Sequence, residues 1–375
     1  MPYKFIYIDD TKDGIEKGTI HGLEDGNEIA IVFRFPEDWE KQMQELINLI
    51  PDVDGIILDL KLNDTPYADG KSATYRGSTV AQELRTLTKD STIKKDFPIV
   101  LVSANEKLDS SLDQTSRDLF DSIISKNDIG HKLSYAEFRS RLKGLAEGYH
   151  YLHQCEKTLS GILNVSQHVN LDVRFVDLFI TKIQIQVPHV IARFLITQLL
   201  CRPSFLIDES YLATRLGVDK TSEDWPLLVD RYLSDFKYTG AFGSYFTRWW
   251  MPMIQLFWEN AISNEHNLRT TEAAKKVELI SDRTGLKKLR PIIKQPKSKS
   301  NSFWVTCKTT RVSIDTIDGF LIAGQDDTFP WQELEYISIS EALRPSGNSV
   351  ASPIEKPRLQ KLKNALEQNE QRVRK

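Results

Sequence analysis

The chain has 375 residues, more than one ordinary hydrophobic core holds and enough for two or three domains. Its 40% hydrophobic and 27% charged residues are typical of a soluble globular protein, and no stretch approaches the ~18 consecutive apolar residues of a membrane span. The net charge of −3 hides an asymmetry, because residues 1–128 contain 25 acidic and 15 basic residues whereas the remainder contains 27 and 34. This split indicates two parts with different partners.

The amino terminus and the cysteines bear on the compartment of the protein. The start runs directly into a strand pattern at Tyr3 and lacks the long apolar segment of a signal peptide, so we expect the protein to stay in the cytoplasm. Cys155, Cys201 and Cys307 lie far apart and form neither a disulfide framework nor a metal-ligand pair by spacing. We interpret them as reduced thiols.

The first 128 residues alternate apolar, β-branched runs with helical patterns. The runs predict five strands, at residues 3–8, 29–33, 55–58, 98–102 and 122–124. The patterns between them predict helices, at about residues 12–22, 37–49, 78–89 and 110–119. Strands that alternate with helices favour a parallel sheet covered on both faces, so the predicted fold class of this part is α/β.

Polar side chains follow the predicted strands at the points where they end. Asp9 and Asp10 follow the first strand, Asp59 the third, Ser103 the fourth and Lys126 the fifth. Ligands of such sheets bind at the carboxyl ends of the strands, near a topological switch point. Three carboxylates at one edge repel one another unless a cation lies among them, and hard oxygen ligands suit Mg²⁺. An ammonium and a hydroxyl there can bind the oxygens of a phosphoryl group on a carboxylate.

This arrangement resembles the receiver domain of bacterial response regulators, which belong to two-component phosphorelay signal transduction. Four segments carry the resemblance, over about a third of the chain: residues 9–10, 57–60, 102–104 and 125–126. The resemblance implies a flavodoxin-like (βα)5 fold with strand order 2-1-3-4-5. It also implies phosphorylation by a histidine kinase or a phosphotransfer protein.

The same resemblance implies roles for individual residues of the chain. Asp59 would be the phosphoacceptor, which makes the protein a phosphoprotein. Asp10, Asp59 and the backbone carbonyl of Lys61 would hold Mg²⁺, and Asp9 would act through a bound water. No enzyme activity is implied beyond phosphoacceptance and autodephosphorylation.

Ser103 and Lys126 would bind the phosphoryl oxygens and change position when the phosphoryl group is attached.

Three features depart from the family pattern. Residues 63–76 form a polar insertion, Ile123 stands where the family usually has an aromatic switch residue, and Asn127 stands where a proline often follows the lysine. The insertion either shields the phosphoacceptor or contacts a partner, or it is a surface loop. We expect the phosphorylation chemistry to be intact. We expect the conformational signal from the phosphorylation site to the opposite face of the domain to differ from that of the family.

Residues 131–165 predict a connecting helix between the first part and the rest. Apolar residues recur at a 3-4 spacing across residues 134–163, which is about four heptads. Two arrangements account for this stripe: a coiled-coil stalk that aligns a homodimer, or a helix that packs on its own domain. Gly144 and Gly148 weaken a helix at this place.

Residues 166–286 predict a helical, aromatic-rich output domain, and six of the seven tryptophans lie after residue 128. The segment 209–233 resembles a helix-turn-helix element. Its second helix, however, offers Glu223 and Asp224 where a DNA-reading helix needs donors and positive charge. Residues 238–258 fit a core of large aromatic side chains better than a ligand surface.

A basic linker is predicted at residues 287–300, and its residues 287–299 include six basic residues and no acid. Lys287, Lys288 and Arg290 are candidates for contact with nucleic acid or an acidic partner, although a solvated run of charge is the default interpretation. The pattern beyond it predicts a small strand-containing unit at 301–344 and a loose polar tail at 345–375.

The leading hypothesis is a response regulator whose receiver domain (residues 1–130) controls a non-standard output module. That module would bind a protein partner or self-associate as a homodimer. The alternative is a DNA-binding transcription regulator that uses the element at 209–233 and the basic stretch at 287–299. No pattern in the sequence points to a membrane partner.

Overall fold

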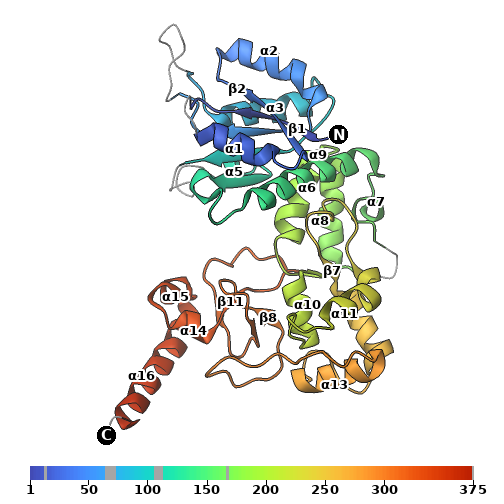
Figure 1. Cartoon of the computed structure of the whole chain (residues 1–375), viewed down its shortest axis with the longest axis vertical. Helices are drawn as coiled ribbons and strands as arrows, with labels where there is room; N and C mark the ends of the chain where they lie inside the picture. The colour runs from blue at the N-terminus through green and yellow to red at the C-terminus, as the bar shows by residue number, and fades with distance from the viewer. Residues whose placement is uncertain (12–14, 64–72, 105–112, 166–168, 374–375) are drawn as a thin grey trace. The chain divides into compact units, whose positions relative to one another are not determined.

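The computed structural model describes residues 1–11, 15–63, 73–104, 113–165 and 169–373, and it divides into two compact units (Figure 1). The first unit comprises Met1–Val165, Val176–Thr197 and Thr239–Phe246. The second comprises Ser166–Phe175, Gln198–Tyr238 and Thr247–Lys375. Among the described helices, none is long and apolar enough to cross a membrane.

The first unit is an α/β domain with one five-stranded parallel sheet in the order β2-β1-β3-β4-β5, which is the flavodoxin-like order. All five predicted strands are confirmed. The elements are β1 (Tyr3–Ile8), α1 (Ile15–Glu24), β2 (Ile29–Arg34), α2 (Trp39–Leu49), β3 (Gly55–Asp59), α3 (Gly77–Lys89), β4 (Ile99–Ser103), α5 (Gln114–Arg117), β5 (Ser122–Ser125), α6 (Tyr135–Gln154), α7 (Leu159–Leu163), α8 (Val173–Gln184) and α9 (Pro188–Leu195).

Side chains of the central strands alternate between two buried layers, as the period of two in a strand requires. Ile6, Leu58 and Leu101 belong to one apolar cluster with residues of α2 and α3. The neighbours Phe5 and Ile57 point to the other face and are also fully buried. Helices α1 and α6 pack together on that face (Figure 1). Both faces are therefore covered, which is why the strands read as continuous apolar runs.

The single helix predicted across residues 134–163 is wrong, because the chain forms two helices there. Helix α6 begins with a capping box in which Ser134 and Glu137 bond each other's backbone amides. It ends at Gln154, where Cys155 turns to an extended conformation. Thr158 then caps the separate helix α7 by accepting a bond from Gly161. The break removes the run of four heptads that a coiled-coil stalk requires.

The apolar stripe of α6 is buried within the first unit. Phe138, Leu142, Leu145, Tyr149 and Leu152 are all 2% exposed or less. This burial accounts for the 3-4 spacing without a second copy of the chain.

Two glycines of α6 allow close approach of aromatic residues from the segment Thr239–Phe246 of the same unit. A Cβ atom at Gly144 would lie 2.1 Å from the Cβ atom of Tyr245. A Cβ atom at Gly148 would lie 1.9 Å from Cδ1 of Phe242. The residues that weakened the helix prediction are therefore required for packing.

We expect Gly144→Ala to destabilise the first unit by about 1–3 kcal/mol, because overpacking outweighs the better helix propensity of alanine. Gly18→Ala in α1 is the matched control, since no described residue outside the neighbouring helix backbone has an atom within 4 Å of the Cβ position at Gly18. This control should stabilise the unit by up to about 1 kcal/mol. Hydrogen exchange of peptides from α1 and α6 measures both effects. Equal stabilisation by the two substitutions would contradict the close contact at Gly144.

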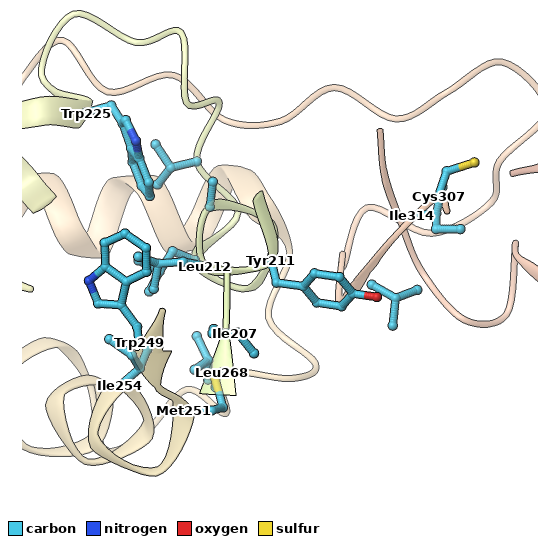
Figure 2. Close-up of a cluster of buried hydrophobic side chains, with 14 of the residues drawn as sticks. Ile207, Tyr211, Leu212, Trp225, Trp249, Met251, Ile254, Leu268, Cys307 and Ile314 are labelled. Carbon is cyan, nitrogen blue, oxygen red and sulfur yellow. The ribbon is translucent and has the colours of Figure 1, made fainter. Parts of the chain in front are cut away.

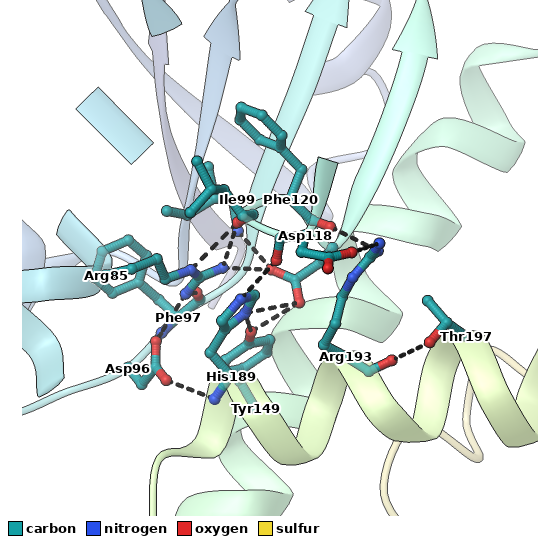
Figure 3. Close-up of polar contacts among 12 residues, drawn as sticks. Arg85, Asp96, Phe97, Ile99, Asp118, Phe120, Tyr149, His189, Arg193 and Thr197 are labelled. Carbon is teal, nitrogen blue, oxygen red and sulfur yellow. Dashed lines mark hydrogen bonds and ion pairs between the residues drawn. The ribbon is translucent and has the colours of Figure 1, made fainter. Parts of the chain in front are cut away.

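A buried polar network lies at the amino-terminal ends of β4 and β5 (Figure 3). Arg85 of α3 donates to Asp96 and to Asp121, each at 2.8 Å. The Tyr149 hydroxyl of α6 donates to Asp121 at 2.8 Å, and the backbone amide of His189 in α9 donates to Asp96 at 2.6 Å. The network joins α3, α6 and α9 to the sheet edge opposite the carboxyl ends of the strands.

The described residues of the second unit form helices of 4 to 18 residues and three two-stranded antiparallel sheets, β6-β7, β8-β9 and β10-β11. Its elements are β6 (Leu206–Ile207), α10 (Glu209–Leu216), α11 (Trp225–Tyr232), β7 (Trp249–Trp250), α12 (Met251–Phe257), α13 (Ala273–Thr284), β8 (Val305–Thr306), β9 (Ser313–Ile314), β10 (Phe320–Leu321), β11 (Tyr336–Ile337), α14 (Ile339–Ala342), α15 (Pro345–Val350) and α16 (Lys356–Val373).

Large aromatic side chains form the core of the second unit (Figure 2). Trp225, Trp249 and Trp258 are buried in one cluster, which agrees with the expected aromatic core. Ala351 and Leu359 belong to the same cluster and are each 1% exposed. The segment expected to be a loose tail therefore contains α15 and most of α16 and contributes to the core.

Candidate functional site

The candidate site lies at the carboxyl ends of the central strands, where the parallel register brings three acids together. β1 pairs with β3 so that Ile8 lies beside Leu58. Asp9 and Asp10 directly follow β1, and Asp59 is the last residue of β3. Because the two strands end side by side, the acids that follow them meet at one edge.

The three carboxylates form one cluster, in which one oxygen of each lies within 4.8 Å of the others. Asp9 and Asp10 are at most 4% exposed, and Asp59 is 7% exposed. The Lys126 ammonium donates to Asp9 at 2.5 Å and to Asp59 at 3.2 Å. The predicted convergence of these four side chains is present in the structure.

The backbone around Asp59 packs tightly against the start of α3. The Leu60 amide donates to the Asp59 carboxylate at 2.7 Å. A Cβ atom at Gly77 would lie 2.1 Å from the Asp59 carbonyl oxygen, so only glycine fits there. The Gly77 amide also donates to the carbonyl of Leu60 at 3.1 Å. These contacts hold the end of β3, and with it the candidate phosphoacceptor, in place.

Burial and mutual repulsion act on the three carboxyl groups of the cluster, and the Lys126 ammonium pairs with Asp9 and Asp59. Burial raises the pKa of Asp59 to about 7, and the Asp9 carboxylate adds to this effect. The Lys126 ammonium and the Leu60 amide oppose the rise without cancelling it. Burial and repulsion of this size favour binding of a further cation.

The donor set of the cluster fits a magnesium ion. Mg²⁺ prefers oxygen ligands and retains waters, so it is commonly held by one or two carboxylates. Asp9, Asp10 and Asp59 offer such oxygens within a span that one ion can bridge. Nitrogen and sulfur ligands, which softer metals prefer, are not part of this cluster among the described residues.

The remaining predicted residues lie around the same edge. Ser103 is the last residue of β4, next to β3, and is 2% exposed. Lys61 lies just after β3, and its backbone forms an isolated antiparallel β-bridge with the backbone of Arg76. Most of the predicted insertion 63–76 lies outside the described residues, since residues 64–72 are not described.

Two residues that sequence reasoning missed hold the Asp9 carboxylate. The Tyr7 hydroxyl donates to Oδ2 of Asp9 at 3.0 Å. The Thr11 amide and hydroxyl donate to Oδ1 at 3.0 and 2.7 Å. Both contacts had a signal in the sequence. Tyr7 and Asp9 are two positions apart, so their side chains lie on the same face of an extended strand. Thr11 lies two positions after Asp9, a spacing at which an aspartate commonly bonds the backbone in a turn.

The basic residues proposed for nucleic-acid contact are each paired with an acid of the second unit. These pairs are Lys287–Asp282, Lys288–Glu223 and Arg290–Asp219. The backbone of this stretch is also bonded to residues 217–222, through β-bridge and amide contacts. The stretch is therefore an ordered segment whose first charges are partly neutralised.

The helix-turn-helix-like segment contains two helices, α10 and α11, as expected from its pattern. The second helix of such a motif reads bases with its amino-terminal residues. Here the Lys288 amide donates to Asp224, the residue before α11, at 2.7 Å. Leu227, Asp230 and Arg231 are the exposed side chains of α11 beyond Pro226. This surface offers one base and one acid, which gives no net attraction to phosphates.

Several solved structures resemble part of this chain. A phosphorylated cyanobacterial phytochrome response regulator, RcpA, is 18% identical, with 40% of this chain and 95% of that chain covered and a TM-score of 0.26. The activated receiver domain of Klebsiella pneumoniae RstA is 19% identical, with 38% and 97% covered and a TM-score of 0.25. A response regulator from Thermotoga maritima is 11% identical, with 39% and 98% covered and a TM-score of 0.26.

These scores are too low to support a functional argument, so the fold assignment depends on the strand order and register of the sheet itself. No protein-family model matches the sequence, and no curated protein does.

Proposed function

We propose that the chain is a response regulator of a phosphorelay, with its first unit as the receiver and Asp59 as the phosphoacceptor. One observation supports this most directly. Asp9, Asp10 and Asp59 converge with Lys126 at the carboxyl edge of a sheet with the order β2-β1-β3-β4-β5. An acidic cluster contacted by the Lys126 ammonium suits a cation and a transferred phosphoryl group.

In the proposed transfer, a carboxylate oxygen of Asp59 attacks the phosphorus of a phosphohistidine on the partner kinase or phosphotransfer protein. The P–N bond breaks, its electron pair stays on the histidine nitrogen, and that nitrogen takes up a proton from water. The product is an acyl phosphate on Asp59. Bound Mg²⁺ would neutralise charge on the phosphoryl oxygens.

The side chains around Asp59 would have distinct roles in this transfer. Asp10, Asp59 and the Lys61 carbonyl would hold the cation, with Asp9 acting through a water. Lys126 now contacts Asp9 and Asp59, and it would exchange the latter contact for a phosphoryl oxygen. Ser103, at the end of the adjacent strand, would bind a second oxygen.

We further propose that the second unit is an output module that acts on a protein partner or on a second copy of the chain. The pairing of Lys287, Lys288 and Arg290 with acids disfavours the alternative of a DNA-binding output. Binding of a duplex DNA that strengthens on phosphorylation would reverse this preference.

The proposal predicts that Asp59→Asn abolishes phosphorylation by acetyl phosphate in the presence of Mg²⁺. Wild-type protein should gain one phosphoryl group, measured by intact mass, and chelation of Mg²⁺ should prevent the gain. Asp52→Asn is the matched control, because Asp52 is an exposed acid in the turn before β3. Phosphorylation of the Asp59→Asn protein to the wild-type extent would refute Asp59 as the acceptor.

A further inference from the structure

A small hollow in the second unit gathers four basic side chains from separate parts of the chain. Arg202, Arg248, Lys308 and Arg311 line it, and we call it the basic hollow. Its volume is about 50 Å³. A single water needs about 10–15 Å³ on the same measure, so the hollow has room for a few waters or one small ion.

The acids of the basic hollow are too few to balance its bases. The two acids are Asp208, which pairs with Arg311, and Glu335, which pairs with Lys308. Among the described lining residues, four bases and two acids give a formal net charge of +2. The hollow is therefore suited to an anion of one or two charges.

Guanidinium groups supply the donors of the hollow that an anion would use. Arg248 is half-buried and donates to the carbonyl oxygens of Leu200 and Thr247, at 2.8 and 2.9 Å, which holds its guanidinium at the wall of the hollow. Arg202 makes no hydrogen bond or ion pair with another described residue. A planar guanidinium binds oxyanions through paired N–H donors, which an ammonium cannot do.

The backbone at Arg311 gives an independent indication that this side chain has a role. Arg311 has a φ of 60°, a left-handed conformation that favours glycine. It lies in the tight turn between β8 and β9, where the Cys307 amide donates to Val312 and the Arg311 amide donates to Cys307. A non-glycine residue in such a conformation occurs in tight hairpin turns and also at ligand sites.

We propose that the basic hollow binds a small tetrahedral oxyanion, either inorganic phosphate or the phosphate group of a monoester. The ion pairs with Asp208 and Glu335 would orient Arg311 and Lys308, while Arg202 and Arg248 would bind the free oxygens. This site belongs to the second unit and uses none of the residues that the proposed phosphorylation requires.

The test is a calorimetric titration of the full chain with inorganic phosphate, without Mg²⁺ and in the Asp59→Asn background so that the receiver site stays silent. We expect saturable binding, competition by sulfate, and no competition by acetate or chloride at the same concentration. Parallel titrations with methyl phosphate and phosphoserine distinguish free phosphate from a monoester as the ligand. Absence of phosphate binding, or equal binding of acetate, would overturn the proposal.

Arg311→Gly is the informative variant, because glycine tolerates the positive φ and the variant should unfold at the wild-type temperature or above it. Its affinity for phosphate should fall at least tenfold. Arg202→Ala should weaken phosphate binding in the same way. It replaces Arg311→Gly in the test if that variant fails to fold. Arg344→Ala is the control, since Arg344 is exposed and pairs only with Glu341 among the described residues. Wild-type affinity in both hollow variants, or duplex DNA binding that phosphate does not displace, would refute the site.

Discussion

Replacing Arg85 with methionine is expected to lower the free energy of unfolding of the first unit by about 3–5 kcal/mol, because two buried carboxylates lose their counter-charge. Arg85 is 8% exposed and contacts Asp96 and Asp121, which are 1% and 6% exposed. It also donates to the carbonyls of Phe97 and Leu119. Few substitutions in this unit would leave as much buried charge uncompensated.

The pH dependence of this effect follows from the Asp121 carboxylate. Burial alone would raise the pKa of Asp121, but the Arg85 guanidinium and the His189 imidazole, whose Nδ1 lies 3.7 Å from Oδ1 of Asp121, outweigh burial and lower the pKa to about 2. A lowered pKa stabilises the folded state above pH ~4, and this contribution is lost as the pH falls through about 2. Without Arg85 the Asp121 carboxylate is costly to bury. Acidification from pH 7 to pH 4 should therefore reduce the difference in free energy of unfolding between the wild-type protein and the Arg85→Met variant.

Hydrogen exchange of peptides from β4 and β5 measures this unit separately from the other one. Lys89→Met is the matched control, since Lys89 is an exposed residue of the same helix, and it should change stability by less than about 0.5 kcal/mol. A loss of less than about 1 kcal/mol in the free energy of unfolding of Arg85→Met would show that the buried carboxylates do not depend on Arg85. A loss that grows on acidification would show the same.

The sheet and its site were predictable because each signal is local. Every strand of the first unit is a short apolar run, and Asp9, Asp59 and Ser103 stand at the ends of those runs. The parallel register then places these residues at one edge without any further information. The supporting contacts of Tyr7 and Thr11 with Asp9 were within reach of the same reasoning.

The buried network was not predictable from such signals. Asp96, Asp121 and His189 are polar residues that resemble ordinary loop residues, and Asp96 and His189 are 93 positions apart. Their partners become evident only when α6 and α9 are placed against the sheet edge. The second unit was equally obscure, because its strands contain two residues each and leave no periodic pattern.

The break between α6 and α7 shows how a true periodicity can mislead. The apolar spacing continues through Leu159 and Leu163, and both segments are helical. Thr158, a residue that prefers the cap position, marks the actual start of α7. A hydroxyl residue within an apolar repeat was the available signal for two helices.

Replacing Lys276 with methionine is expected to stabilise the second unit at pH 6 by about 2–4 kcal/mol, because the wild-type protein buries an ammonium there and no carboxylate of a described residue forms an ion pair with it. Lys276 lies on α13 and is 0% exposed. Its ammonium donates to the carbonyl oxygen of Arg215 at 2.7 Å. Burial lowers the pKa of Lys276 to about 7, and the charges of Arg269 and Arg215 add to this while Asp315 opposes it.

The sign of the pH dependence follows from the proton count of the two states. Below pH ~7 both states carry the proton, so the folded state bears the whole penalty of a buried ammonium. Between pH ~7 and the unfolded value of ~10.4, only the unfolded state carries it, and stability therefore rises with pH. Near pH 10 the penalty is gone, and methionine then loses only the bond to Arg215, which costs about 1 kcal/mol.

Urea unfolding followed by tryptophan fluorescence reports mainly on this unit, because six of the seven tryptophans lie in it. Lys275→Met is the control, since Lys275 lies on the same helix with its side chain 41% exposed and pairs with Glu278. Its effect should be small at both pH values. The difference between Lys276→Met and wild type should change sign between pH 6 and pH 10. A variant that is less stable at both pH values would mean that the Arg215 contact outweighs the burial of the charge.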